Sequence, residues 1–96
     1  MNNCGVSVKI VSKPRFWDLQ EGGEACTMRV VTAKKRGKFN EDTYFWLNVF
    51  APEQVDLCRE YEQGMEIIVL GELMNRHDYD LDKDRLEIRG LKLGIA

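Results

Sequence analysis

Short runs of alternating apolar and polar residues dominate the first half of the chain, and this is the period of half-buried β-strands. Residues 6–11 and 26–33 follow the alternation, and residues 43–51 are rich in aromatic and β-favouring side chains. Pro14 ends the first run, so Trp17 is expected in the loop that follows the first strand, and Gly22-Gly23 marks a turn before the second. The pattern therefore predicts three strands, with the charged residues 34–38 forming an exposed loop before the third.

A single helix is predicted after the third strand. Pro52 suits the first helical position, and Glu53 favours the positive helix start. Gly64 supplies a stop signal, so the helix is expected at about residues 52–63. Its apolar side chains share one face: Val55, Leu57, Cys58 and Tyr61.

The last third of the chain returns to the strand pattern. Residues 65–73 carry apolar side chains on both faces, which indicates a strand buried on both sides or one that closes a barrel. Residues 76–83 are expected to form a polar loop. In the final strand, Gly90 shifts the phase between Leu86 and Ile88 on one side and Leu91, Leu93 and Ile95 on the other, which indicates a bulge.

This order of elements defines a fold class. Five strands with a helix between the third and the fourth is the order of the OB fold. We therefore expect an all-β chain with one helix, a five-stranded OB-fold β-barrel forming a single domain over residues 1–96.

Composition narrows the function. The chain has 96 residues and a net charge of −2, from 14 basic and 16 acidic side chains, which argues against coating nucleic acid by charge alone. No apolar stretch approaches the roughly 20 residues of a membrane span, and the first residues lack signal-peptide features. Cys4, Cys26 and Cys58 form no disulfide framework, and the latter two are expected in the core. A cytoplasmic protein is the expectation.

The third strand carries the clearest functional signal. Period two places Phe45, Leu47 and Val49 toward the core and Tyr44, Trp46, Asn48 and Phe50 outward. Outward aromatic rings suit stacking of unpaired bases. The alternative is that a neighbouring subunit or a loop covers this face.

A basic loop precedes that strand. Lys34, Lys35, Arg36 and Lys38 are cations that suit phosphates, and Phe39 offers a further ring for stacking. The alternative is an ordinary solvated loop.

Further motifs carry a resemblance to a known family. They are the acidic-Thr-aromatic start of the third strand at residues 42–45, Tyr61-Glu62-Gln63-Gly64 at the helix end, and Val69-Leu70-Gly71-Glu72-Leu73 with Arg76 soon after. With these motifs the chain resembles the bacterial single-stranded DNA-binding proteins over roughly residues 5–95, most specifically at 61–76. The resemblance implies that single-stranded DNA wraps over OB folds that assemble as homodimers or homotetramers. It also implies that the subunits pair through the edges of their first β-strands.

The resemblance also implies site residues. Phe45 or Trp46 matches the family's stacking aromatic, and Trp46 is favoured because Phe45 shares a face with core residues. Tyr79 lies near the aromatic of a later hairpin, and Arg76 matches a basic position that meets phosphate. Pro52 departs from the pattern, since the family often has an aromatic residue or Gly there.

The leading hypothesis is a single-stranded DNA-binding protein, largely independent of sequence, that acts in replication, repair or recombination near the nucleoid. Its expected partner is single-stranded DNA, with no cofactor, metal, membrane, small-molecule substrate or catalysis. The second hypothesis is an interaction subunit, similar to primosomal proteins, whose aromatic face is an oligomer or partner interface. The expected DNA-binding residues are Trp46, Phe50, Tyr44, Phe39, Tyr79, Trp17, Lys34, Lys35, Arg36, Lys38 and Arg76.

Overall fold

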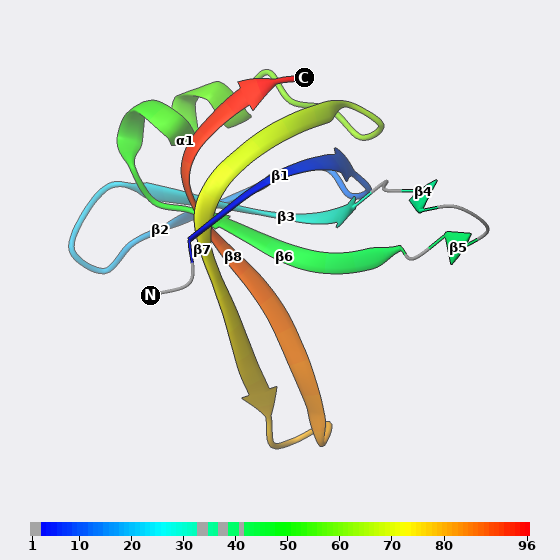
Figure 1. Ribbon diagram of the computed structural model, residues 1–96. Coiled ribbons are helices and arrows are strands. Elements are labelled where there is room, and N and C mark those ends of the chain that lie inside the picture. The colour runs from blue at the N-terminus through cyan, green and yellow to red at the C-terminus, as the bar shows by residue number, and fades with distance from the viewer. Residues whose placement is uncertain (1–2, 33–34, 37–38, 41) are drawn as a thin grey trace.

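Five strands close into a ring in the computed structural model, which describes residues 3–32, 35–36, 39–40 and 42–96 (Figure 1). They are β1 (Asn3–Ile10), β3 (Glu24–Thr32), β6 (Thr43–Val49), β7 (Glu66–Asp78) and β8 (Lys83–Ile95). They pair in the order β1-β7-β8-β6-β3, and β3 then pairs with residues 8–10 of β1. Only β6 and β8 run parallel among these five pairs of described strands. The predicted all-β OB arrangement, with its helix after the third ring strand, is confirmed.

Three short strands were missed by the sequence analysis. β2 (Arg15–Asp18) pairs with the first half of β3, so Trp17 lies in a strand and not in a loop. Gly22 and Gly23 make the predicted turn between them, with φ angles of 95° and 88°. The expected basic loop contains β4 (Lys35–Arg36) paired with β5 (Phe39–Asn40).

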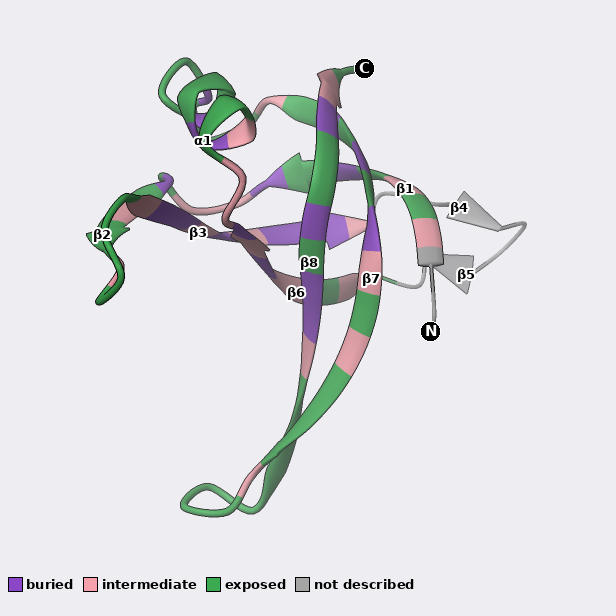
Figure 2. Cartoon of the chain, turned by 90° about the vertical axis from the view of Figure 1, so that its left-hand side faces the viewer, coloured by how far each residue is buried: buried purple, intermediate pink, exposed green. Residues whose placement is uncertain are grey.

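Buried residues occur on the ring strands and on α1 (Figure 2), and their side chains form one hydrophobic core. Leu47 and Val49 are fully buried, as the alternation of the third strand predicts. Cys26 and Cys58 are buried as predicted, and a hydrogen bond to Cys26 together with burial raises the pKa of Cys58, which stays a thiol. The remaining fully buried aliphatic side chains come from β1, β3, β7, β8 and the helix: Val8, Ile10, Met28, Val30, Val55, Ile67, Val69 and Ile88.

The helix is shorter than predicted, since α1 covers only Pro52–Cys58. The next three backbone N–H groups, of residues 59–61, donate to carbonyls three residues back, a tighter winding that ends the α-helix. Tyr61 is thereby buried, at 6% exposure. Gly64, with φ of 95°, forms the turn into β7, and its N–H donates to the Ile10 carbonyl at 2.8 Å.

The prediction of a polar loop at residues 76–83 is wrong. β7 and β8 stay paired as far as Asp78 and Lys83 and form a long hairpin that stands away from the ring (Figure 1). The end of this hairpin is solvated on both faces, so it shows no alternation that would indicate strands.

The predicted phase shift in β8 is confirmed as a bulge. Pairing moves from Leu70 opposite Lys92 to Gly71 opposite Gly90, which leaves Leu91 as the extra residue. Of the three apolar residues after Gly90, only Leu93 is buried. The outward side chains of β7 are also exposed, so β7 is buried on one side only and closes the ring.

Candidate nucleic-acid interface

β6, together with Phe50 directly after it, presents aromatic side chains on the outside of the ring, and we call this surface the aromatic face. Tyr44 is 47% exposed, and Trp46 and Phe50 are half-buried. Phe45 packs partly against the core, so the outward aromatic of the Phe45-Trp46 pair is Trp46. The predicted division of this strand into two faces is confirmed, and the DNA-binding role of its outward residues stays a prediction.

Arginines from neighbouring strands lie over two of these rings. The guanidinium carbon of Arg29, on β3, lies 5.5 Å from the centre of the Tyr44 ring and 4.9 Å from that of Trp46. The guanidinium of Arg85, on β8, lies 5.0 Å from the Trp46 ring centre. A cation over an aromatic face is held by the ring quadrupole. Two arginines therefore lie over the Trp46 ring.

The second aromatic group lies at the other end of β6. The rings of Trp17 and Phe50 meet edge to face, with centres 6.1 Å apart and planes at 88°. Arg89, on β8, places its guanidinium carbon 5.5 Å from the Phe50 ring centre. Three strands thus bring a second pair of rings and a further cation to this face.

These arginines were missed by the sequence analysis. Arg29 lies between the core residues Met28 and Val30, so its outward direction follows from the period of the strand. Arg89 likewise follows the buried Ile88. The available signal was a cation at an outward strand position, whereas the predicted cations all lie in segments expected to be loops.

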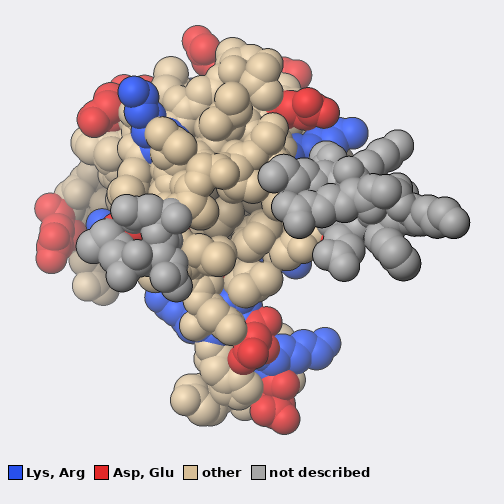
Figure 3. Space-filling view, viewed as in Figure 1, with Lys and Arg blue, Asp and Glu red and all other residues tan. Residues whose placement is uncertain are grey.

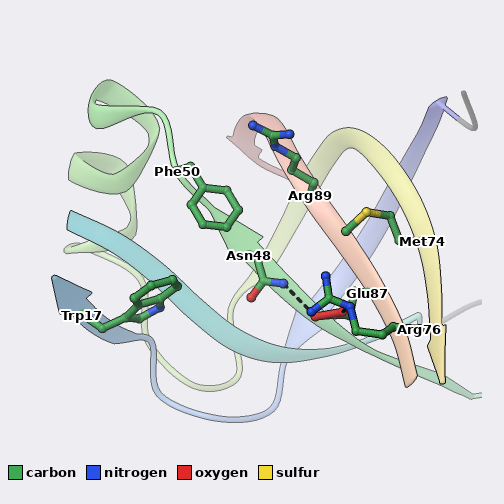
Figure 4. Close-up of a pocket in the computed structure, with 7 residues that line it drawn as sticks. All are labelled: Trp17, Asn48, Phe50, Met74, Arg76, Glu87 and Arg89. Atoms are coloured by element: carbon green, nitrogen blue, oxygen red, sulfur yellow. Dashed lines mark hydrogen bonds and ion pairs between the residues drawn. The ribbon is translucent and has the colours of Figure 1, made fainter. Parts of the chain in front are cut away.

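A chain of polar contacts starts at Trp17 and crosses five strands, and Figure 4 shows its part from Asn48 to Glu87 and Arg76. Trp17 Nε1 donates to Thr27 Oγ1 at 3.0 Å, and Thr27 Oγ1 donates to Asn48 Oδ1 at 2.9 Å. Asn48 Nδ2 donates to Glu87 Oε1 at 3.1 Å. Arg76 Nε lies 3.3 Å from Glu87 Oε2. The contacts fix the Trp17 indole and place a carboxylate in the middle of the face.

Hollows on this surface include one beside each aromatic group. The first, of about 520 Å³, lies over the polar chain, and its lining residues are Trp17, Asn48, Phe50, Met74, Arg76, Glu87 and Arg89. The second hollow, of about 410 Å³, lies between the Tyr44 and Trp46 side of the aromatic face and the hairpin. Its lining residues are Arg29, Tyr44, Trp46, Asp78, Leu81, Lys83, Asp84, Arg85 and Leu86.

The remaining predicted DNA-binding residues either lie apart from the aromatic face or have side chains that the structure does not describe. Tyr79, at the hairpin tip, is 87% exposed and meets His77 edge to face, with ring centres 4.7 Å apart. Lys34 and Lys38 lie outside the described residues. For Lys35, Arg36 and Phe39 the backbone is described and the side chains are not.

Charge is unevenly distributed over the surface. Basic side chains gather where the hairpin leaves the body, and acidic side chains lie on the hairpin and around the rim of the body (Figure 3). His77 Nδ1 lies 2.9 Å from Asp84 Oδ1 across the hairpin. The described residues contain no group of three side chains arranged to hold a metal ion. None of the helices described is long and apolar enough to cross a membrane.

The fold defined by this ring and helix is the OB fold, and solved structures share it. A small single-stranded DNA-binding protein from Streptomyces coelicolor is similar with a TM-score of 0.86 and 15% sequence identity, covering 98% of this chain and 93% of the other. The second single-stranded DNA-binding protein of Mycobacterium smegmatis is similar with a TM-score of 0.78 and 18% sequence identity, and the match covers 98% of this chain and 87% of the other.

A third similar structure contains a ligand. It is a Plasmodium falciparum single-stranded DNA-binding protein in complex with single-stranded DNA, with a TM-score of 0.75, 21% identity, and coverage of 98% of this chain and 91% of the other. No family model and no curated protein matches the sequence. The similarity therefore lies in the fold.

Proposed function

We propose that this chain binds single-stranded DNA with little dependence on base sequence, in replication, repair or recombination, and without catalysis. The observation that carries the proposal is the outward face of β6, where Trp46 and Phe50 lie beside arginines from two neighbouring strands. The proteins of similar fold from Streptomyces, Mycobacterium and Plasmodium, which are described as single-stranded DNA-binding, support it. This function would bring the chain to the cytoplasmic nucleoid.

The mechanism combines stacking with charge. Bases stack on Trp46, Phe50 and Trp17, each stack contributing about 1–3 kcal/mol. Tyr44, Tyr79 and Phe39 assist at the edges of the path. Phosphates pair with Arg29, Arg76, Arg85 and Arg89, and with the basic residues Lys34, Lys35, Arg36 and Lys38.

A different surface suits a second copy of the chain, and we infer that the protein is a homodimer or homotetramer. Ile68 and Leu70, on β7, are 44% and 49% exposed and point outward; with the neighbouring Gly5 of β1 we call them the β7 outer face. Among the described residues, residues 3–7 of β1 pair only with β7, so one edge of β1 is open there. An open edge beside aliphatic side chains favours strand pairing between copies. The aromatic face thereby stays available to DNA.

The test is a titration of tryptophan fluorescence with oligothymidine at low and at high salt. Trp17 and Trp46 are the only tryptophans, so quenching reports on the face itself. Deep quenching that weakens with salt is expected. Absence of binding, confirmed by an independent method, would contradict the proposal.

Trp46→Ala separates DNA binding from the interface hypothesis. We expect about tenfold or greater loss of affinity, from the lost stack, with an unchanged mass by light scattering. Trp46→Phe is the control and keeps most of the affinity because it keeps a ring. A Trp46→Ala protein that dissociates yet binds DNA normally would favour the aromatic face as a protein interface.

A further inference from the structure

A buried carboxylate lies in the middle of a face proposed to meet phosphates. Glu87, on β8, is 6% exposed and pairs in register with Trp46 on one side and Met74 on the other. Its Oε1 accepts the hydrogen bond from Asn48. Its Oε2 is buried and receives no hydrogen bond from any described residue. Arg76 Nε lies 3.3 Å from Oε2, close enough for an ion pair but without the alignment of a hydrogen bond.

The carboxylate lines the first hollow together with aromatic rings. The Trp17 and Phe50 rings stand on one side of it and Arg76 on the other (Figure 4). A carboxylate only accepts hydrogen bonds, and its two oxygens offer about four acceptor positions. A buried acceptor without a donor is unfavourable. The hollow therefore matches a flat ligand with N–H groups along one edge.

We propose that this hollow takes one base of the bound strand with its edge toward Glu87, and that it prefers guanine to thymine. The inference rests on the proposed function, to which it adds selectivity at a single position. Guanine carries two neighbouring donors, N1–H and the 2-amino group, which match the two oxygens of a carboxylate. Thymine offers one N–H between two carbonyl oxygens, and these repel the carboxylate.

Arg76 covers Oε2 until a strand binds. Its side chain is 68% exposed, and its ion pair with Glu87 is the only one it forms with a described residue. A phosphate of the incoming strand competes for this guanidinium, since arginine pairs strongly with phosphate. When Arg76 turns to the phosphate, Oε2 is freed for the base. The ring of Trp17 or Phe50 then holds the plane of the base.

The experiment compares three short strands on the wild-type protein: oligothymidine, the same strand with one central guanine, and the same strand with inosine there. A short strand can shift its register, so a single guanine reaches the hollow. A bidentate contact to a base is worth about tenfold in affinity, which is the expected preference for guanine over thymine. Inosine, which lacks the 2-amino group, is expected to lie between them.

Glu87→Gln removes the charge and keeps the shape. The preference for guanine is expected to fall to near equality. The guanine strand loses its contact with the carboxylate, and oligothymidine binds at least as tightly as it does to the wild-type protein because the repulsion of the thymine carbonyls is gone. Glu60→Gln is the matched control, since it removes an exposed carboxylate that does not line the hollow, and it retains the preference. A preference that survives in a folded Glu87→Gln protein would overturn the assignment.

The outcomes separate the two proposals. Equal binding of the three strands by the wild-type protein overturns base selectivity and leaves single-stranded DNA binding standing. Failure of all three to bind overturns both. If Glu87→Gln does not fold, the comparison of guanine with inosine on the wild-type protein decides, because equal affinities would show that the 2-amino group makes no contact.

Discussion

A guanidinium over an aromatic ring occupies the surface on which a base would stack. Arg29 and Arg85 take this position at Trp46. A cation–π contact at a partly exposed site is worth about 0.5–1 kcal/mol, and a base stack about 1–3 kcal/mol. Stacking therefore displaces the arginine, which becomes available to a phosphate. Ring stacking and charge neutralisation are coupled at the same residues.

Arg89 lies over the Phe50 ring in the same way. The variant Arg89→Gln tests this coupling through the salt dependence of DNA binding. Log affinity falls as log salt rises, and loss of one phosphate contact makes this negative slope less steep by about 0.7 for a single strand. The measurement is a titration of a labelled oligothymidine at several salt concentrations. Arg59→Gln is the control, because Arg59 also lies over a ring, at 4.7 Å from the centre of Phe16, but pairs with Glu24 and Asp56 beside the helix. Equal slopes for wild type and Arg89→Gln would show that Arg89 meets no phosphate.

The direction of a side chain could be predicted from the sequence only where apolar and polar residues alternate along a strand. The outward direction of Trp46 followed from the alternation with Leu47 and Val49, which the structure shows buried. Glu87 gave no such signal, because an acidic residue at an outward strand position is ordinary in a sequence. Its burial arises from contacts with Asn48 and Arg76, which other strands bring to it. Pairing across strands is not contained in the local pattern.

The β7–β8 bulge depends on a glycine where two strands approach closely. A Cβ added at Gly71 would lie 2.2 Å from the carbonyl oxygen of Arg89, a backbone atom that side-chain rotation cannot relieve. We expect Gly71→Ala to lower the free energy of unfolding by about 2 kcal/mol or more, measured by urea denaturation. Gly94→Ala is the control in the same hairpin, since its Cβ would meet no described atom within 4 Å. Equal unfolding midpoints for the two variants would contradict this account.

The hairpin tip gives a separate test of the binding path. Tyr79 is 87% exposed, so Tyr79→Ala removes almost no packing. We expect an unchanged unfolding midpoint and an affinity for oligothymidine reduced by about five- to tenfold, the value of one stack. Tyr79→Phe should restore the affinity, since stacking needs the ring and not the hydroxyl. Unaltered affinity in Tyr79→Ala would place the strand away from the tip.

Elements were predictable where a core imposed a period. β6 and the first half of β7 have buried alternate residues and were found. The end of the hairpin is solvated on both faces, so its sequence shows no strand period and predicts a loop. The helix end was misplaced because the winding that buries Tyr61 depends on packing, whereas Gly64 gave a stop signal three residues later. β2 was missed because a four-residue strand after Pro14 is too short to show a period.

At the scale of the whole molecule, the ring separates two surfaces. The aromatic face lies on β6 with its neighbours β3 and β8, and the β7 outer face lies where β7 pairs with β1. The order of elements, read from the sequence, was sufficient for the OB topology. Closure through β1 and β3 and the parallel pairing of β6 with β8 are long-range contacts, which local pattern does not encode.

Leu70→Lys tests whether the second surface joins copies of the chain. Leu70 is 49% exposed, so the substitution is tolerated in a monomer, but a lysine buried against a second copy would lose its hydration. We expect light scattering to show a multiple of 11.1 kDa for the wild-type chain and the monomer mass for the variant. The depth of tryptophan quenching by oligothymidine should persist, because the aromatic face is unchanged. Affinity for long strands should fall, since linked sites bind more tightly than single ones.

Leu57→Lys is the matched control for that measurement. Leu57 is 40% exposed on α1, outside the β7 outer face, so its replacement should leave the scattering mass unchanged. A wild-type chain that scatters as a monomer would remove the β7 outer face as an interface between copies. Dissociation by both variants would show a general loss of stability instead. Dissociation by Leu70→Lys alone, with quenching retained, would establish that assembly and DNA binding use different sides of the ring.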